Sequence, residues 1–252
     1  MKPILFACDL DNTLIRSYKH RREGDLCVEW IDGKEQGYMS PEVCELLRQA
    51  VQAVELVPVT TRSVAQYQRI VWPEGCRPRR AITTHGATLL CGEAPDSTWM
   101  ADTRRLTEPL LPALQRIVAD LDATGLYLRC RMVDDAYAFV YCSREERSME
   151  TAMAWPLPEG VYRIRSGKKI YFIPVGIDKG CAVRRFRQPE HRTLVCAGDS
   201  DMDVAMLDVA DVALCPAALA GQLNPQGQLH ACSDDAFGVE LLQKVLEIAS
   251  RA

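Results

Sequence analysis

The chain has 252 residues, of which 48% are hydrophobic and 25% are charged, and its formal net charge is −4. This length can bury one large core or a core with a smaller second domain, while the acidic balance argues against nucleic acid or an anionic membrane as a partner. No apolar run approaches the roughly 20 residues of a membrane-spanning helix, and the eleven cysteines include no CxxC pair, so we expect a protein of the reducing cytoplasm.

The first predicted element is a strand over residues 3–8, and no export signal of charged, apolar and small residues precedes it. Further apolar runs of strand length follow at residues 53–59, 193–198 and 211–215. Their hydrophobicity is continuous, which favours strands covered on both faces in a parallel sheet. Helical patterns begin near Ser40, Arg62, Asp178, Ser200 and Phe237. This alternation predicts an α/β core with a Rossmann-like, doubly wound parallel sheet.

The middle of the chain has a different pattern. It predicts a hairpin, helices over residues 106–123 and 144–154, and strands bunched around the turn at residues 134–136 and at 161–175. Such strands are antiparallel in character. We therefore predict a core of residues 1–86 and 166–252, with an α+β domain inserted at 87–165. Glycines at the two crossings, Gly86 and Gly167, are expected to serve as hinges.

Acidic residues follow the predicted core strands. Asp9 and Asp11 follow the first strand, and Asp199 follows the strand at 193–198, with Asp203 four residues later. Because the carboxyl ends of parallel strands meet at one crevice, these carboxylates should converge. They cannot all ionise there without a counter-ion, and Mg²⁺ is the hard cation that carboxylates and a substrate phosphate bind together. The acids therefore predict a magnesium site.

Residues suited to phosphate lie at neighbouring positions. Lys179 opens a predicted helix, whose N-terminal amides would attract the same anion, and Thr60 offers a hydroxyl at the end of the second strand. Together with the acids, these residues predict a phosphoryl-transfer site.

These motifs resemble those of the haloacid-dehalogenase-like (HAD-like) phosphohydrolases with an inserted C2-type cap, in the Cof-like and sucrose-phosphatase-like branch. The matching residues are Asp9-Leu10-Asp11-Asn12-Thr13, Thr60, Lys179, and Asp199 and Asp203 in the GDSDMD motif. The resemblance covers the predicted core, about two-thirds of the chain. Thr61, His85 and Met202 depart from residues that are common in the related phosphatases.

The resemblance implies a role for each residue. Asp9 would be the nucleophile that forms an aspartyl-phosphate, and Asp11 would be the general acid and base. The metal ligands would be Asp9, Asp11 through its backbone carbonyl, Asp199 and Asp203. The phosphate would be bound by Thr60, Thr61 and Lys179.

Candidate substrate contacts are Arg62, His85 and Arg16. Arg16 belongs to a basic segment, residues 16–23, which is followed by a predicted hairpin turning at Asp32 and Gly33. Such a segment is ordinarily a solvated face, and the alternative is that its Arg16, Lys19, Arg21 and Arg22 receive an anionic substrate. His85 is either a hinge residue or a substrate contact. Lys168 and Lys169 are expected to be solvated charges of a cap strand or hinge.

We therefore expect a Mg²⁺-dependent phosphomonoesterase of a small phosphorylated metabolite, with a sugar phosphate as one candidate. One alternative is a phosphosugar mutase that uses the same nucleophile. The other is a non-catalytic binding module that has kept the fold. No residue pattern indicates an oligomeric state.

Overall fold

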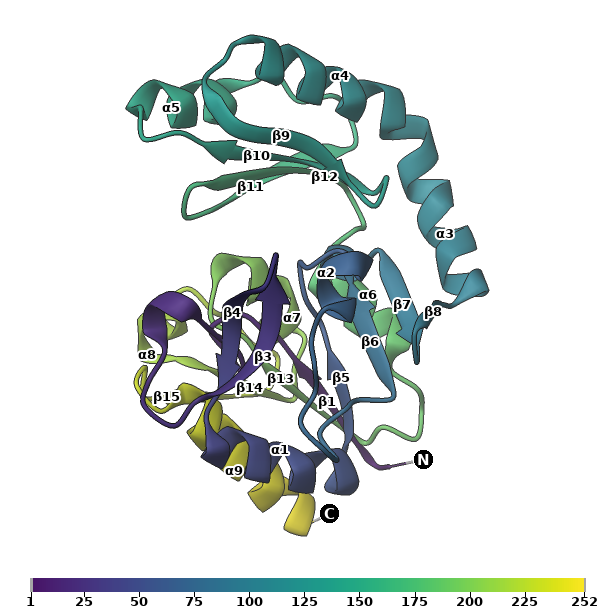
Figure 1. Cartoon of the computed structure of the whole chain (residues 1–252). Coiled ribbons are helices and arrows are strands. Elements are labelled where there is room, and N and C mark those ends of the chain that lie inside the picture. The colour runs from purple at the N-terminus through teal and green to yellow at the C-terminus, as the bar shows by residue number, and fades with distance from the viewer. Residues whose placement is uncertain (1, 252) are drawn as a thin grey trace.

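The computed structural model describes residues 2–251, and its core is built on five parallel strands in the order β15-β14-β13-β1-β5 (Figure 1). Their bounds are β1 Ile4–Cys8, β5 Glu55–Pro58, β13 Thr193–Ala197, β14 Val212–Pro216 and β15 Gln228–Cys232. From β1 the chain moves outward to β5, and later it returns beside β1 as β13 and moves the other way. The β1–β13 junction is thus the switch point of a doubly wound sheet, where ligands bind in such folds. The predicted fold class is confirmed.

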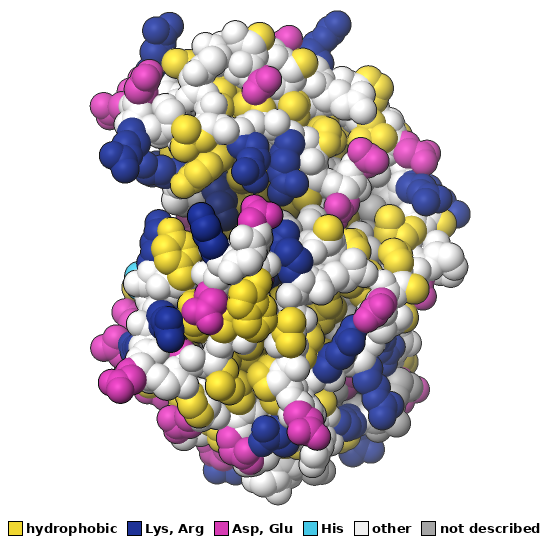
Figure 2. Space-filling model, viewed as in Figure 1, with side chains coloured by type: hydrophobic (Ala, Val, Ile, Leu, Met, Phe, Trp, Pro, Cys, Tyr) yellow, Lys and Arg dark blue, Asp and Glu magenta, His cyan; other side chains and the backbone are white. Residues whose placement is uncertain are grey.

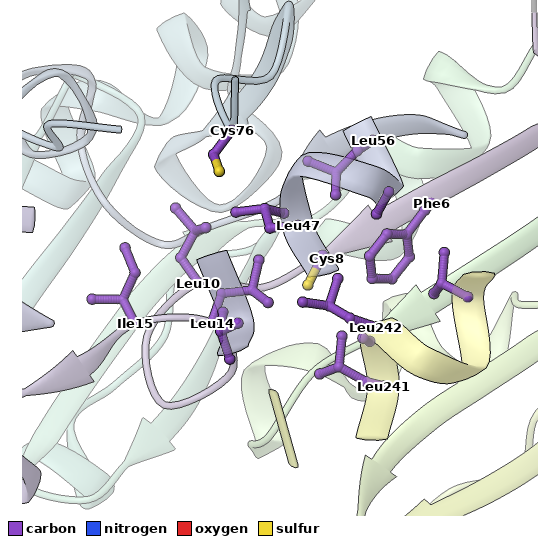
Figure 3. Close-up of a cluster of buried hydrophobic side chains, with 14 of the residues drawn as sticks. Phe6, Cys8, Leu10, Leu14, Ile15, Leu47, Leu56, Cys76, Leu241 and Leu242 are labelled. Atoms are coloured by element: carbon purple, nitrogen blue, oxygen red, sulfur yellow. The ribbon is translucent and has the colours of Figure 1, made fainter. Parts of the chain in front are cut away.

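Helices cover both faces of this sheet. Residues 4, 6 and 8 of β1 pack with α1 (Pro41–Ala53) and α9 (Phe237–Ser250), as Figure 3 shows for part of this cluster. Leu5 and Ala7 point to the opposite face, which packs against α6 (Lys179–Phe186), α7 (Val204–Asp208) and α8 (Ala217–Ala220). This alternation follows from the two-residue period of a strand.

The segment after β1 forms a small sheet beside the carboxyl ends of the core strands. It contains β2 (Arg16–Ser17), the 3₁₀ helix η1 (Tyr18–His20), β3 (Leu26–Ile31) and β4 (Lys34–Met39). The β3–β4 hairpin turns at residues 32 and 33, as predicted. The short helix α2 (Val64–Gln68), which follows β5, ends earlier than its sequence pattern predicted.

A four-stranded antiparallel sheet, here called the cap sheet, lies above the core in Figure 1. Its strands, in spatial order, are β11 (Val161–Ser166), β12 (Lys169–Pro174), β10 (Tyr137–Cys142) and β9 (Tyr127–Val133). Apolar residues on one face pack beneath α4 (Leu111–Ala123) and α5 (Glu146–Ala154). The opposite face looks toward the core. The α+β character predicted for the middle of the chain is confirmed.

The pairing of the strands places the limits of the insertion later in the chain than residues 87 and 165. That the insertion forms a separate domain stays a prediction. Strand β12 belongs to the cap sheet although it lies beyond residue 165. The hairpin of β6 (Arg80–Thr83), β7 (Thr88–Cys91) and β8 (Ala94–Pro95) lies beside β5, and α3 (Ser97–Thr107) buries Trp99 in the core cluster. The chain therefore leaves the core near residues 107–111 and returns near 175–178.

The two predicted hinges are wrong. Gly86 ends the short 3₁₀ helix η2 (Thr84–Gly86) in the buried core, where an added Cβ would lie 2.6 Å from the carbonyl oxygen of Asp178. A glycine is needed at position 86 because the backbone approaches so closely there and because φ is +106°. Gly167 lies in the tight turn between β11 and β12. Neither residue lies at a crossing.

Two further differences have local causes. The predicted helix over residues 106–123 is divided between α3 and α4 by the 3₁₀ helix η3 (Glu108–Leu110), because Pro109 cannot donate the backbone hydrogen bond that a continuous helix requires. The helix expected from Ser200 begins as the 3₁₀ helix η4 (Asp201–Asp203) before α7. No helix within residues 2–251 is long and apolar enough to cross a membrane.

Candidate active site

Three carboxylates meet at the switch point of the core sheet. Asp9 follows β1, Asp199 follows β13, and Asp203 ends η4; each offers an oxygen, and these oxygens lie within 4.8 Å of one another. The two strand ends are tied together, because the Asp9 N–H donates to the carbonyl of Ala197 at 2.8 Å. The convergence expected from the strand ends is therefore present.

Local hydrogen bonds hold Asp203 in place. Its Oδ2 accepts from the backbone N–H groups of Asp199 and Ser200 at 3.1 Å and from the Ser200 hydroxyl at 3.0 Å. This reciprocal capping at the start of η4 leaves Oδ1 directed to the centre of the site.

Lys179 joins two of the acids. It is the first residue of α6, it is 1% exposed, and its Nζ donates to Asp9 Oδ1 and, at 2.5 Å, to Asp203 Oδ1. Burial acts to lower the pKa of Lys179, but the charges of Asp203 and Asp9 outweigh it and raise the pKa. The lysine therefore remains charged and holds Asp9 in a fixed position.

One lysine does not neutralise this cluster. Burial, together with the charges of Asp203, Asp199 and Asp11, raises the pKa of Asp9 despite Lys179. Burial and Asp203 raise the pKa of Asp199 to about 7. Three carboxylates crowded around one ammonium group form a donor set that fits a hard divalent cation such as Mg²⁺.

The second strand end brings Thr60, Thr61 and Arg62 to the same edge. Thr60 is fully buried, and its hydroxyl accepts from the backbone N–H of Arg62 at 3.2 Å. Thr61 is partly exposed in the cleft described below, and its carbonyl accepts the hydroxyl of Tyr137 from the cap sheet at 3.0 Å.

Asp11 does not enter the acidic cluster through its side chain. Arg62 donates to both of its oxygens, at 2.9 Å and 2.7 Å, and also contacts Glu29 at 3.0 Å. Burial acts to raise the pKa of Asp11, but the hydrogen bonds and charge of Arg62 outweigh it and lower the pKa. Asp11 is therefore an ionised carboxylate held by an arginine.

A cleft of about 510 Å³ lies between the core and the cap sheet. Its core side includes Asp11, Asn12, Thr61 and Arg62, next to the acidic cluster. Its cap side is formed by residues from β9, β10 and β12: Arg131, Val133, Tyr137, Phe139, Lys169 and Tyr171. Lys169 was expected to be a solvated charge of a cap strand or hinge, and it is indeed an exposed residue of the cap strand β12, although it also lines this cleft. The alternation along β12, with Lys169 and Tyr171 on one face, is the sequence signal that marks this surface.

The other two predicted substrate contacts differ in position. Arg16 reaches the cleft but pairs with Asp25 at 3.2 Å. His85 is 2% exposed, lies outside the cleft lining, and its Nε2 is 3.3 Å from the Tyr162 hydroxyl, which donates to the carbonyl of Ile177. Burial lowers the pKa of His85 to about 4, so its ring is neutral.

No protein-family model matches the chain, and no curated protein sequence matches it. Solved structures do. The sucrose-phosphatase of Synechocystis sp. PCC6803, in complex with sucrose and phosphate, has a TM-score of 0.62 at 14% identity, over 98% of this chain and 98% of that chain. A haloacid dehalogenase-like hydrolase from B. subtilis has a TM-score of 0.61 at 17% identity, over 96% of this chain and 99% of that chain. A trehalose-6-phosphate phosphatase related protein has a TM-score of 0.59 at 16% identity, over 98% and 97%.

The chain therefore has the fold of the HAD-like phosphatases, over almost the whole length of these structures. This confirms the structural expectation drawn from the motif resemblance. The motif residues also lie where the fold places ligands, at the carboxyl ends of β1, β5 and β13.

Proposed function

We propose that this protein is a Mg²⁺-dependent phosphomonoesterase that hydrolyses a small phosphorylated metabolite through an aspartyl-phosphate on Asp9. The observation that carries the proposal is the group of Asp9, Asp199 and Asp203 around Lys179 at the switch point of the sheet. Two solved structures with this fold are named as a sucrose-phosphatase and a trehalose-6-phosphate phosphatase related protein, which supports a sugar phosphate as substrate.

The acidic cluster would bind the metal and Asp9 would attack. Asp9, Asp199 and Asp203, with the backbone carbonyl of Asp11, would hold Mg²⁺, which when bound supplies positive charge beside the phosphoryl oxygens. Lys179 donates to Oδ1 of Asp9, whereas Oδ2 has, among the described residues, only a 3.5 Å contact with the Thr13 hydroxyl. Oδ2 is therefore the oxygen available to attack phosphorus, with Lys179, Thr60 and Thr61 as phosphate contacts.

Asp11 would transfer the protons. It would protonate the leaving oxygen and then accept a proton from the water that hydrolyses the aspartyl-phosphate. Because Arg62 holds Asp11 ionised, this role requires the Asp11–Arg62 pair to loosen when substrate enters the cleft.

The test is hydrolysis of p-nitrophenyl phosphate and of a panel of phosphorylated metabolites. We expect Mg²⁺-dependent release of phosphate that EDTA abolishes and that needs no bisphosphate activator, which a mutase would require. The Asp9→Asn variant should be folded by circular dichroism and inactive. Full activity after exhaustive EDTA treatment, or turnover by folded Asp9→Asn, would contradict the proposal.

A further inference from the structure

The core-facing side of the cap sheet carries cations that the proposed chemistry does not use. Strand pairing aligns Arg131 with Phe139 and Phe139 with Tyr171, and in the next row it aligns Tyr141 with Lys169. Arg131 and Lys169 therefore lie on one face with aromatic rings, and both line the cleft. Figure 2 shows Lys and Arg side chains gathered around the hollow between the core and the cap sheet.

The other cations of the cleft already have carboxylate partners. Arg62 pairs with Asp11 and Glu29, Arg69 pairs with Glu29 at 3.0 Å, and Arg16 pairs with Asp25. Within residues 2–251, Arg131 and Lys169 form no ion pair with an acidic side chain. The buried Nε of Arg131 also has no hydrogen-bond partner in the described part of the chain. A buried donor without a partner lowers the stability of the folded protein unless a ligand accepts its hydrogen bond.

These cations lie on the cap side of the cleft, across from Asp11 and Arg62 on its core side. Burial acts to raise the pKa of Asp11, whereas the charge of Lys169, like that of Arg62, lowers it. Tyr171 lies in the same row as Arg131, next to the row of Lys169, and the charges of Lys179, Asp11 and Asp9 act on its pKa. The reacting phosphate belongs at Asp9 and Lys179, in the core. The cap cations are therefore left for the opposite end of the substrate.

We propose that Arg131 and Lys169 bind a second anionic group, a carboxylate or a phosphate, on the leaving group of the substrate. This rests on the proposed phosphatase function and specifies its substrate class. The cleft volume of about 510 Å³ suits a small metabolite, and arginine and lysine are the donors that bind both kinds of oxyanion.

The experiment compares substrates that differ only by the second anion. The pairs are 3-phosphoglycerate with glycerol 3-phosphate, for a carboxylate, and fructose 1,6-bisphosphate with fructose 6-phosphate, for a phosphate. At least one anion-bearing member should have a kcat/KM about 10-fold above that of its partner, as for a charge-assisted contact. Arg131→Met and Lys169→Met should each remove most of this advantage, mainly through KM. Both should hydrolyse p-nitrophenyl phosphate within about twofold of the unmodified protein.

Arg116→Met provides a matched control, because Arg116 is an exposed cation of α4, which covers the opposite face of the cap sheet. It should keep the anion preference. Thermal stabilisation by the same four compounds, without turnover, gives a second readout. If neither readout showed a preference for an anion-bearing compound, the proposal would be overturned. It would also be overturned if Arg131→Met and Lys169→Met lost as much activity on p-nitrophenyl phosphate as on the anion-bearing substrates, because the cations would then act on the reacting phosphate. Loss of all hydrolysis with a preserved binding preference would instead refute only the phosphatase function.

Discussion

Arg62 organises the floor of the cleft at the scale of single residues. Its guanidinium joins Asp11, which follows β1, to Glu29 of β3, and Glu29 in turn binds Arg69. The Glu29 side chain is 6% exposed, and both arginines form ion pairs with it. Breaking a buried ion pair on one side leaves a charge without compensation.

Arg62→Met should lower the free energy of unfolding by about 2–3 kcal/mol. The double variant Arg62→Met/Glu29→Gln should lose less than the sum of the single variants, because it removes both charges. Urea denaturation measures both quantities. The exposed pair Arg77–Glu93 is the control, and Arg77→Met should change stability by less than about 0.5 kcal/mol. Additive losses at positions 62 and 29 would show that the two residues do not interact.

His85 predicts a pH dependence of stability. Its folded pKa of about 4 lies below the ordinary value of 6.5, so the unfolded chain binds the proton more readily. Stability is therefore complete above pH 6.5 and falls as the pH decreases toward 4, by up to roughly 3 kcal/mol from this residue. His85→Asn removes the titration and tolerates the left-handed backbone, where φ is 56°. Its unfolding free energy should depend less steeply on pH between 6.5 and 4; identical slopes would contradict this assignment.

The site residues that the sequence predicted are those placed by strand ends. Asp9, Thr60 and Asp199 each follow a buried apolar run, and that position is enough to bring them together. The contact of Arg62 with Glu29 was not predictable, because it depends on how the β3–β4 hairpin packs. The same applies to Arg131, whose position over the cleft depends on the placement of the cap sheet.

At the scale of elements, the junction of α6 and α7 fixes the distance between Lys179 and Asp203. An added Cβ at Gly180 would lie 2.2 Å from the carbonyl oxygen of Ala205. Gly180→Ala should therefore separate the helices, lower the free energy of unfolding by about 2 kcal/mol or more and reduce phosphatase activity. Gly221→Ala is the control, since no atom of residues 2–251 lies within 4 Å of its added Cβ. Denaturation and assay of both variants provide the test, and a Gly180→Ala protein as stable and active as the control would show that the junction is not rigid.

Most elements follow from local patterns, whereas their association does not. Ser40 and Pro41 correctly marked the start of α1, because the Ser40 hydroxyl accepts from the Val43 N–H. The sequence did not reveal that α3 belongs with the core. That depends on Trp99, whose ring packs in the core cluster and whose Nε1 donates to the carbonyl of Gly86 at 3.1 Å.

At the scale of the whole molecule, Asp134 joins the cap sheet to the core. It lies in the β9–β10 turn, accepts from the Val64 N–H of α2 at 2.9 Å and accepts the Thr84 hydroxyl. Asp134→Ala should therefore increase the rate of hydrogen exchange at the Val64 amide by about 10-fold or more. Asp135→Ala is the control. It also places alanine in a left-handed backbone conformation, since φ is 51° at Asp135 and 46° at Asp134, but it should leave the Val64 amide protected from exchange. Equal exchange in the two variants would mean that Asp134 does not hold the closed arrangement.

The central claim is that Asp9 becomes phosphorylated, and the Asp11→Asn variant tests it most directly. With p-nitrophenyl phosphate the leaving group needs no acid, so the first step should proceed while hydrolysis of the intermediate is slowed. We predict a burst of about one p-nitrophenolate per protein chain. Borohydride reduction during the burst should convert residue 9, and no other aspartate, to homoserine, as detected by peptide mass spectrometry. Steady turnover without a burst, or label on a residue other than Asp9, would contradict the account.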